Sequence, residues 1–175
     1  MITKYHAKYY ANVLIQRSIG GDIDSLSQSL LNAAVNINPH QIEAFTFALS
    51  SLELGGAILA DEVGLGKTIE AGLVIKYLLC SGKDKILLIM PSNLRKQWQV
   101  ELEEKFDIDS LIVDSSNWED YLAKVKSKQA VIIVSYHFAS KRKTEFGKIA
   151  WDFCVFDEAH RLRNVYKNGS KMANL

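Results

Sequence analysis

The spacing of apolar positions changes near residue 55 of this 175-residue chain. Before that point apolar residues recur at helical intervals, first within residues 24–36 and again after Pro39, where Ile42 and Phe45 start one helix face. Beyond it, short apolar runs alternate with amphipathic stretches. The pattern predicts a mixed or helical N-terminal segment, a helix after Pro39, and then alternating strands and helices.

Short unbroken apolar runs predict the strands of this second region. Such runs suit strands that are buried on both faces, as in a parallel sheet covered by helices. The fold class expected is therefore α/β, built from βαβ units. The predicted strands are residues 57–60, 86–90, 111–113, 131–134 and 153–156, and the predicted helices are residues 67–79, 94–105 and 117–126.

Polar segments directly follow four of the predicted strands. Ligands of open parallel sheets bind beyond the carboxyl ends of the strands. We therefore expect these segments to converge along one edge of the sheet. They are residues 61–66, 91–92, 135–136 and 157–158.

Composition and charge exclude several classes of protein. The hydrophobic content of 48% suits a globular core, and a net charge of +1 leaves no overall basic excess, so any nucleic-acid contact has to be local. The apolar runs are too short to span a bilayer and no apolar signal core follows Met1, so we expect a cytoplasmic protein with no membrane partner. Cys80 and Cys154 lie in apolar runs, and we expect both to be buried, reduced thiols.

The sequence DEVGLGKT at residues 61–68 has the composition of a phosphate-binding turn. It stands between a predicted strand and a predicted helix. Gly64 and Gly66 allow positive φ and close approach of the backbone, so the N–H groups of Gly64, Leu65 and Gly66 can point at phosphates. An ordinary glycine turn before a helix is the alternative, but it does not explain the Lys and Thr that follow.

Lys67 and Thr68 supply the charged and hydroxyl groups of this turn. Lys67 is a point charge for the terminal phosphates, and the Thr68 hydroxyl is a ligand for Mg²⁺. The general P-loop has Gly where this chain has Asp61. The segment therefore predicts binding of ATP or a close relative, with one departure from the general pattern.

Two adjacent carboxylates follow the last predicted strand. Asp157 is placed to hold Mg²⁺, and Glu158 to orient or deprotonate an attacking water. Alone, the pair could equally be a solvated acidic turn. Together with the upstream P-loop it predicts a site for hydrolysis of a Mg-nucleotide, in which Lys67, Asp157 and Glu158 face one another across the triphosphate.

The chain resembles a known family of motors through an ordered set of motifs. Four segments resemble helicase motifs I, Ia, Ib and II of superfamily 2, the last of them a DEAH box: residues 61–72, 89–98, 134–136 and 157–160. They are similar to the Swi/Snf group of double-stranded DNA translocases, which has an aspartate at the position of Asp61. The resemblance extends to the bacterial branch of that group, which includes the RNA-polymerase-recycling ATPase. The resemblance covers residues 37–165.

The resemblance implies further roles for individual residues. Gln41, in a Q motif, would contact the adenine edge, and His160 would couple the nucleotide and nucleic-acid sides. Trp98 is expected to be a packing residue. Contacts to the phosphodiester backbone of duplex DNA are implied for Ser92, Arg95, Gln97, Ser135 and Tyr136. Two basic clusters, at residues 141–143 and at Arg161 and Arg163, fit either a nucleic-acid groove or solvated loops.

The resemblance also implies a domain organisation. The family's motor has two RecA-like lobes with ATP between them, and the second lobe supplies arginine fingers. We expect residues 1–36 to be an N-terminal extension and residues 37–175 to be an incomplete first lobe, truncated before motif III. By analogy with related P-loop ATPases, the missing motif III strand would lie between the P-loop strand and the acidic strand. We expect hydrolysis by this chain alone to be weak.

Two other functions remain open at this stage. One is a non-catalytic nucleic-acid or partner-binding module derived from a helicase lobe. The other is a small-molecule P-loop kinase. Expected partners of the full-length motor are duplex DNA, the second lobe, and RNA polymerase or a nuclease. The sequence does not distinguish polymerase recycling, phage defence and repair.

Overall fold

The structure, a computed structural model, describes residues 38–60, 66–125 and 130–162. These residues fall into two units. The N-terminal unit contains the described residues up to Gly82 together with Glu104–Asp107. The sheet unit contains Lys83–Glu103 and the described residues from Ile108 onward. The extension predicted over residues 1–36 lies outside the described residues.

Helix α3, Pro39–Ser51, confirms the helix predicted after Pro39. Its start is a capping box, in which the backbone N–H of Asn38 donates to Gln41 Oε1 at 3.0 Å. Proline suits the first helical position because its missing N–H would have no partner within the helix. A short 3₁₀ turn, Leu52–Leu54, continues from α3.

Helix α4, Lys67–Cys80, packs against α3. The rings of Phe45 and Tyr77 meet edge to face, with their centroids 6.1 Å apart. Gly72 is buried against the ring of Phe106, and a Cβ at this position would collide with that ring. A small residue is therefore required at the centre of α4.

The strand predicted over residues 57–60 is absent, so that prediction was wrong. These residues have irregular backbone, and Ile58 is 84% exposed. They follow Gly55 and Gly56, which have φ values of 99° and 139°. A strand is held by its neighbours' hydrogen bonds, and an apolar run without a partner strand gains nothing from the extended conformation.

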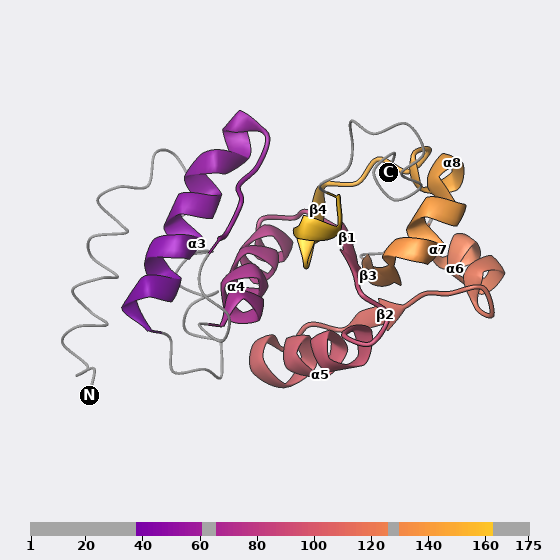
Figure 1. The fold of residues 1–175 in the computed structure, drawn as a ribbon, viewed down its shortest axis with the longest axis horizontal. Helices are drawn as coiled ribbons and strands as arrows, with labels where there is room; N and C mark the ends of the chain where they lie inside the picture. Colours follow the sequence, from indigo (N-terminus) through magenta and orange to yellow (C-terminus); the bar gives the residue numbers. More distant parts are fainter. Residues whose placement is uncertain (1–37, 61–65, 126–129, 163–175) are drawn as a thin grey trace. The chain divides into compact units, whose positions relative to one another are not determined.

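The other predicted strands form one parallel sheet in the order β2-β3-β1-β4 (Figure 1). In the central pair Ile86 lies opposite Val131 and Ile89 opposite Val134. This confirms the α/β class and the parallel pairing. The strands are β1 Lys85–Met90, β2 Ser110–Ile112, β3 Ala130–Ser135 and β4 Phe153–Phe156.

Helices cover both faces of this sheet. Figure 1 shows α5 on one side and α6, α7 and α8 on the other. On the latter side Leu87 and Ile132 join Trp118, Phe138 and Phe146 in one buried cluster. The alternate strand residues are also buried, as expected for strands inside a parallel sheet. The helices are α5 Arg95–Phe106, α6 Trp118–Val125, α7 Tyr136–Lys141 and α8 Lys143–Phe146.

Strand β4 lies at one edge of the sheet, and its burial alternates along the strand. Cys154 on β4 and Cys80 at the end of α4 are both free and exposed. The prediction that they are buried was wrong, because the apolar run containing Cys154 is an edge strand and Cys80 is the last residue of its helix. Within the described ranges, every helix is too short or too polar to cross a bilayer.

Candidate functional site

Gly66 begins α4 in the left-handed region, with φ 92° and ψ 38°. Its carbonyl oxygen accepts hydrogen bonds from the N–H groups of Ile69 and Glu70, at 2.8 and 3.2 Å. This glycine therefore turns the chain directly into the helix. The N–H groups of a first helical turn have no partner among preceding helical carbonyls, and the helix dipole favours an anion there.

The predicted ligands around Gly66 are only partly described. Gly64 and Leu65 lie outside the described residues, as does Asp61, so their roles stay predictions. Lys67 and Thr68 occupy the first two helical positions and are partly exposed. In the described part, Gly66, Lys67 and Thr68 thus stand in this order at the start of a helix, as the sequence predicted.

Gln41 packs directly against Gly66. It is 3% exposed, and a Cβ built on Gly66 would lie 2.5 Å from Gln41 Nε2. Its Oε1 accepts the capping hydrogen bond from Asn38. Gln41 therefore has a local structural role beside the turn, and its predicted contact with adenine stays a prediction.

The start of α4 at Gly66 fits the polyphosphate group that the sequence predicts. Any side chain at position 66 would need an unfavourable φ and would meet the Gln41 amide. Backbone that only glycine can form is typical of sites where a phosphate approaches N–H groups closely.

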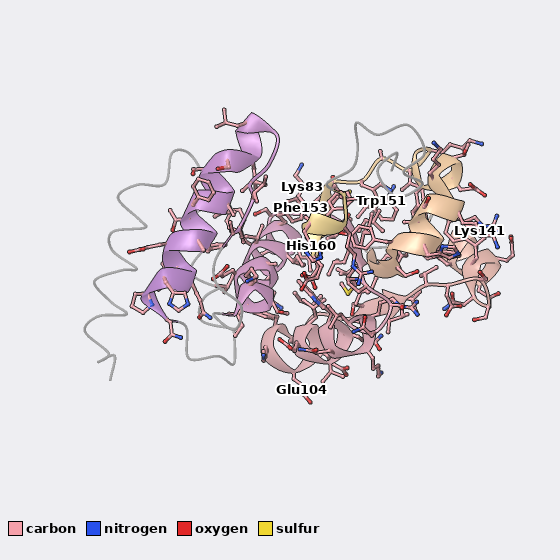
Figure 2. All side chains as sticks on the ribbon, in the orientation of Figure 1. Lys83, Glu104, Lys141, Trp151, Phe153 and His160 are labelled. Atoms are coloured by element: carbon pink, nitrogen blue, oxygen red, sulfur yellow. The ribbon has the colours of Figure 1, made fainter. Side chains whose placement is uncertain are left out.

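The acidic turn, Asp157 and Glu158, follows β4 directly (Figure 2 labels Phe153 at the start of the strand and His160 beyond its end). The backbone N–H of Asp157 donates to the Ile89 carbonyl at 2.9 Å and so continues the ladder with β1. Glu158 then takes a left-handed conformation with φ 55°. Such backbone is unfavourable for glutamate and concentrates at functional sites.

Two side chains from other parts of the sheet unit hold Asp157. Trp98 Nε1–H donates to Asp157 Oδ2 at 2.9 Å, and the Tyr136 hydroxyl donates to the Asp157 carbonyl at 2.8 Å. The other carboxylate oxygen, Oδ1, accepts the Glu158 backbone N–H at 2.9 Å. Burial, with a contribution from the Asp157 charge, raises the pKa of Tyr136 to about 12. The hydroxyl therefore remains a donor at neutral pH.

His160 pairs with the second carboxylate of the turn. Its Nδ1 lies 3.0 Å from Glu158 Oε2, and both side chains are about half exposed. The imidazole is thus in contact with the group expected to handle the attacking water. The predicted coupling role of His160 stays a prediction, now with a defined first partner.

The residues predicted to contact DNA differ in their exposure. Ser92 and Gln97 are exposed, and Gln97 Nε2 donates to Glu101 Oε1 at 2.8 Å. Arg95 is partly exposed, and its Nε donates to the Ser92 carbonyl at 3.3 Å. These three residues surround the start of α5.

Ser135 and Tyr136 are less available than the residues of α5. The Ser135 hydroxyl caps α7 by accepting the Phe138 N–H at 3.1 Å. Tyr136 is 2% exposed. Its hydroxyl donates to the Asp157 carbonyl, and the predicted DNA contact of Tyr136 stays a prediction.

The basic cluster at residues 141–143 spans the last residue of α7, the turn at Arg142 and the first residue of α8. Arg142 forms an ion pair with Glu145 at 2.9 Å and stacks over the Trp118 ring, 5.6 Å from its centroid. Arg142 is therefore a packing residue, while Lys141 and Lys143 are exposed. Arg161 is exposed, and Arg163 lies outside the described residues.

The donors to Asp157 were not predicted as parts of the site. Trp98 was assigned to packing and Tyr136 to DNA, although both bind the acidic turn. Trp98 is 59 positions from Asp157, and a single sequence carries no signal that pairs them. The pairing follows from the strand order of the structure, because α5 follows β1 and the acidic turn follows its neighbour β4.

The described residues contain no cluster of three or more His, Cys, Asp or Glu side chains suited to a metal. Mg²⁺ in nucleotide sites needs few protein ligands, because phosphates and waters fill most of its octahedron. One positioned carboxylate, Asp157, and one hydroxyl, Thr68, are hard oxygen donors of the right kind. Each of these two side chains is therefore chemically suited to the predicted ion.

Comparison with known proteins gives consistent relatives. A family model described as SNF2-related domain matches residues 40–174. RNA polymerase-associated protein RapA of Yersinia enterocolitica is 35% identical over 131 residues, and the Bacillus subtilis protein YqhH, named as an ATP-dependent helicase, is 40% identical over 131 residues. A solved Sulfolobus solfataricus SWI2/SNF2 ATPase core in complex with dsDNA has a TM-score of 0.68 and 26% identity.

The similarity covers most of this chain and a small part of each relative. The aligned region is 71% of this chain and 13% of RapA, and 72% of this chain and 22% of YqhH. The structural match covers 78% of this chain and 29% of the Sulfolobus chain. The matched region is thus one portion of larger proteins.

Proposed function

Because this chain belongs to the family of SNF2-related domains, we propose that it forms the first RecA-like lobe of an ATP-dependent DNA translocase. The observation that carries the proposal is the acidic turn, in which Asp157 is held by Trp98 and Tyr136 at the end of a parallel strand. Parallel sheets present ligand-binding groups at this end of their strands. A merely solvated acidic turn has no need of two buried donors.

In this proposal, residues at the start of α4 and in the acidic turn bind the nucleotide and its Mg²⁺. Lys67 binds the terminal phosphates, Thr68 and Asp157 hold Mg²⁺, and Glu158 orients the attacking water. When bound, Mg²⁺ neutralises charge that develops on the phosphates. The preceding Gly64, Leu65 and Gly66 supply backbone N–H groups, and Gln41 contacts the base.

Duplex DNA is the proposed track, and the start of α5 is its proposed contact. The Sulfolobus core was solved in complex with dsDNA, which supports this assignment. Ser92, Arg95 and Gln97 contact the phosphodiester backbone, which positions DNA without reading sequence. Ser135 contributes from the β3 end. Since DNA is the track, the cytoplasm is the proposed location.

The complete enzyme requires a second lobe in this proposal. Arginine fingers typically contribute about 10³–10⁵ in rate, so hydrolysis by residues 1–175 alone is slow. The RapA relatives are named as RNA polymerase-associated, which supports RNA polymerase as a further partner over a nuclease.

Binding of Mg-ATP by residues 1–175 tests the function directly. Isothermal titration calorimetry should detect binding that Lys67→Ala weakens about 100-fold or more, since a point charge on the phosphates is lost. Lys83→Ala, at an exposed lysine outside α4, should bind like the parent chain. Equal binding by the parent and Lys67→Ala chains contradicts the assignment.

A second experiment, which measures binding of duplex DNA by the same chain, separates the remaining alternatives. Retention of duplex DNA without any Mg-ATP binding would favour a non-catalytic module. Nucleotide binding with phosphoryl transfer to a small acceptor, unaffected by DNA, would favour a kinase.

A further inference from the structure

The Asp157 carboxylate is fixed from both of its oxygens. Oδ1 accepts the Glu158 backbone N–H, and Oδ2 accepts the Trp98 indole N–H, each at 2.9 Å. A carboxylate offers about four lone-pair positions, so each oxygen retains capacity for a metal ion. The two hydrogen bonds therefore select one orientation of the group without blocking it.

We propose that Trp98 is a positioning residue that orients the Asp157 carboxylate for Mg²⁺, and this rests on the function proposed above. The indole is a donor without acceptor capacity, and Trp98 is 4% exposed, so its N–H needs a protein partner. A hydrogen bond to an ionised acceptor is about twice as strong as a neutral one. Asp157 satisfies the indole, and the indole holds Asp157.

Trp98 and Tyr136 act on different parts of Asp157. The Tyr136 hydroxyl binds the main-chain carbonyl and so fixes the path of the backbone after β4. Trp98 binds the side chain and so fixes its rotamer. Loss of Trp98 alone leaves the turn in place with a carboxylate that keeps only the Glu158 N–H as a partner among the described residues and is therefore less firmly oriented. Partners of this kind typically contribute 10–100-fold to metal affinity.

Helix α5 gives this contact a second consequence. Trp98 lies one helical turn after Arg95, which is among the residues assigned to DNA. The helix that carries the DNA contacts therefore also carries the donor that orients the metal-binding carboxylate.

The hydrogen bond itself is tested by NMR on residues 1–175 with ¹⁵N-labelled tryptophan. The indole signals are assigned with Trp→Phe variants of the three tryptophans. Asp157→Asn replaces the charged acceptor by a neutral one, so the Trp98 indole signal should move while that of Trp151 stays. An unmoved Trp98 signal overturns the proposal, whether or not the chain binds nucleotide.

The positioning role is tested by nucleotide affinity with and without Mg²⁺. Trp98→Phe should weaken Mg-ADP binding by about tenfold or more and leave ADP binding in EDTA unchanged. Trp151→Phe is the matched control, because it removes an indole hydrogen bond of 3.0 Å to the Phe146 carbonyl. It should change neither affinity.

The outcomes separate the two proposals. If the parent chain binds Mg-ADP and Trp98→Phe binds it equally well, positioning by Trp98 is overturned and the nucleotide site stands. If the parent chain binds no nucleotide, the proposed function fails and the metal role of Trp98 fails with it. Equal weakening of ADP with and without Mg²⁺ would indicate a structural effect and would also overturn the proposal. Should Trp98→Phe not fold, the Asp157→Asn spectrum decides.

Discussion

The start of α4 and the acidic turn after β4 present their chemistry by different means. At α4 the backbone conformation determines the arrangement, since Gly66 in a left-handed conformation leads directly into Lys67 and Thr68. At the acidic turn, side chains from α5 and from the start of α7 hold Asp157. The first region depends on residues that must stay small, and the second on residues that must keep their hydrogen-bond partners.

The largest effect should come from replacing the glycine that begins α4. Gly66→Ala places a Cβ at a positive φ and against Gln41 Nε2, so the turn has to rearrange. Mg-ATP affinity should fall about 100-fold or more, because the N–H groups proposed to bind the phosphates are displaced.

Gly82, beyond the other end of α4, provides the control for this substitution. It also has a positive φ, of 78°, but a Cβ there meets nothing within 4 Å. Gly82→Ala should cost about 1 kcal/mol of stability and leave nucleotide affinity unchanged. Titration calorimetry measures the Mg-ATP affinity of both variants. An affinity of Gly66→Ala equal to that of the parent chain would contradict the comparison.

A smaller effect is expected at the centre of α4. Gly72→Ala drives a methyl group into the ring of Phe106, and overpacking of this kind costs about 1–3 kcal/mol. Urea denaturation should show the loss. Adding Phe106→Leu should recover part of the lost stability. If the loss in the double variant equals or exceeds the sum of the losses in the two single variants, the contact is refuted.

The smallest effect is expected at the start of β1, where the side chain of Asp152 holds the backbone of the sheet unit. Asp152 Oδ2 accepts the backbone N–H groups of Lys85 and Asp84, at 2.9 and 3.0 Å. These hydrogen bonds, chiefly the one from the Lys85 N–H, hold the pKa of the Asp152 carboxyl below its usual 3.8. Asp152→Asn should cost about 1 kcal/mol or less at pH 7, since the group is exposed.

The same carboxyl gives a signed pH dependence. A pKa lowered by folding contributes stability above the usual value, and that contribution is lost as the pH falls through the lower, folded value. The difference in free energy of unfolding between the parent chain and Asp152→Asn should therefore shrink below pH 4. Urea melts at pH 7 and pH 3 measure it, and a difference that grew with acid would contradict the assignment.

Local patterns in the sequence predicted most of the fold. The runs that form β1 and β3 were identifiable because strands buried on both faces are apolar throughout. The run of β4 is also apolar, although this strand is exposed at alternate positions. Helices α4 to α6 begin and end within two residues of their predicted limits. Helices α7 and α8 were missed because the cluster at residues 141–143 resembles a loop in composition. Its central Arg142 is instead neutralised by Glu145 and stacked on Trp118.

The misplaced strand shows where local pattern is insufficient. Residues 57–60 have the composition of a buried strand, but composition does not supply a neighbour to pair with. The candidate site divides in the same way. Lys67, Thr68, Asp157 and Glu158 were predicted as site residues because each stands in a short motif. Trp98 was assigned to packing, since its partner lies in another motif and only the strand order brings them together.

The position of β4 has a practical consequence for handling this chain. In the described sheet β4 pairs with β1 on one side, and Cys154 and Phe156 on it are exposed. A strand with an open edge is a template for recruiting a second molecule. Concentrated preparations should therefore lose soluble material over time, faster without a reductant because the Cys154 thiol can cross-link the associated molecules. Dilution and thiol protection should lengthen storage life.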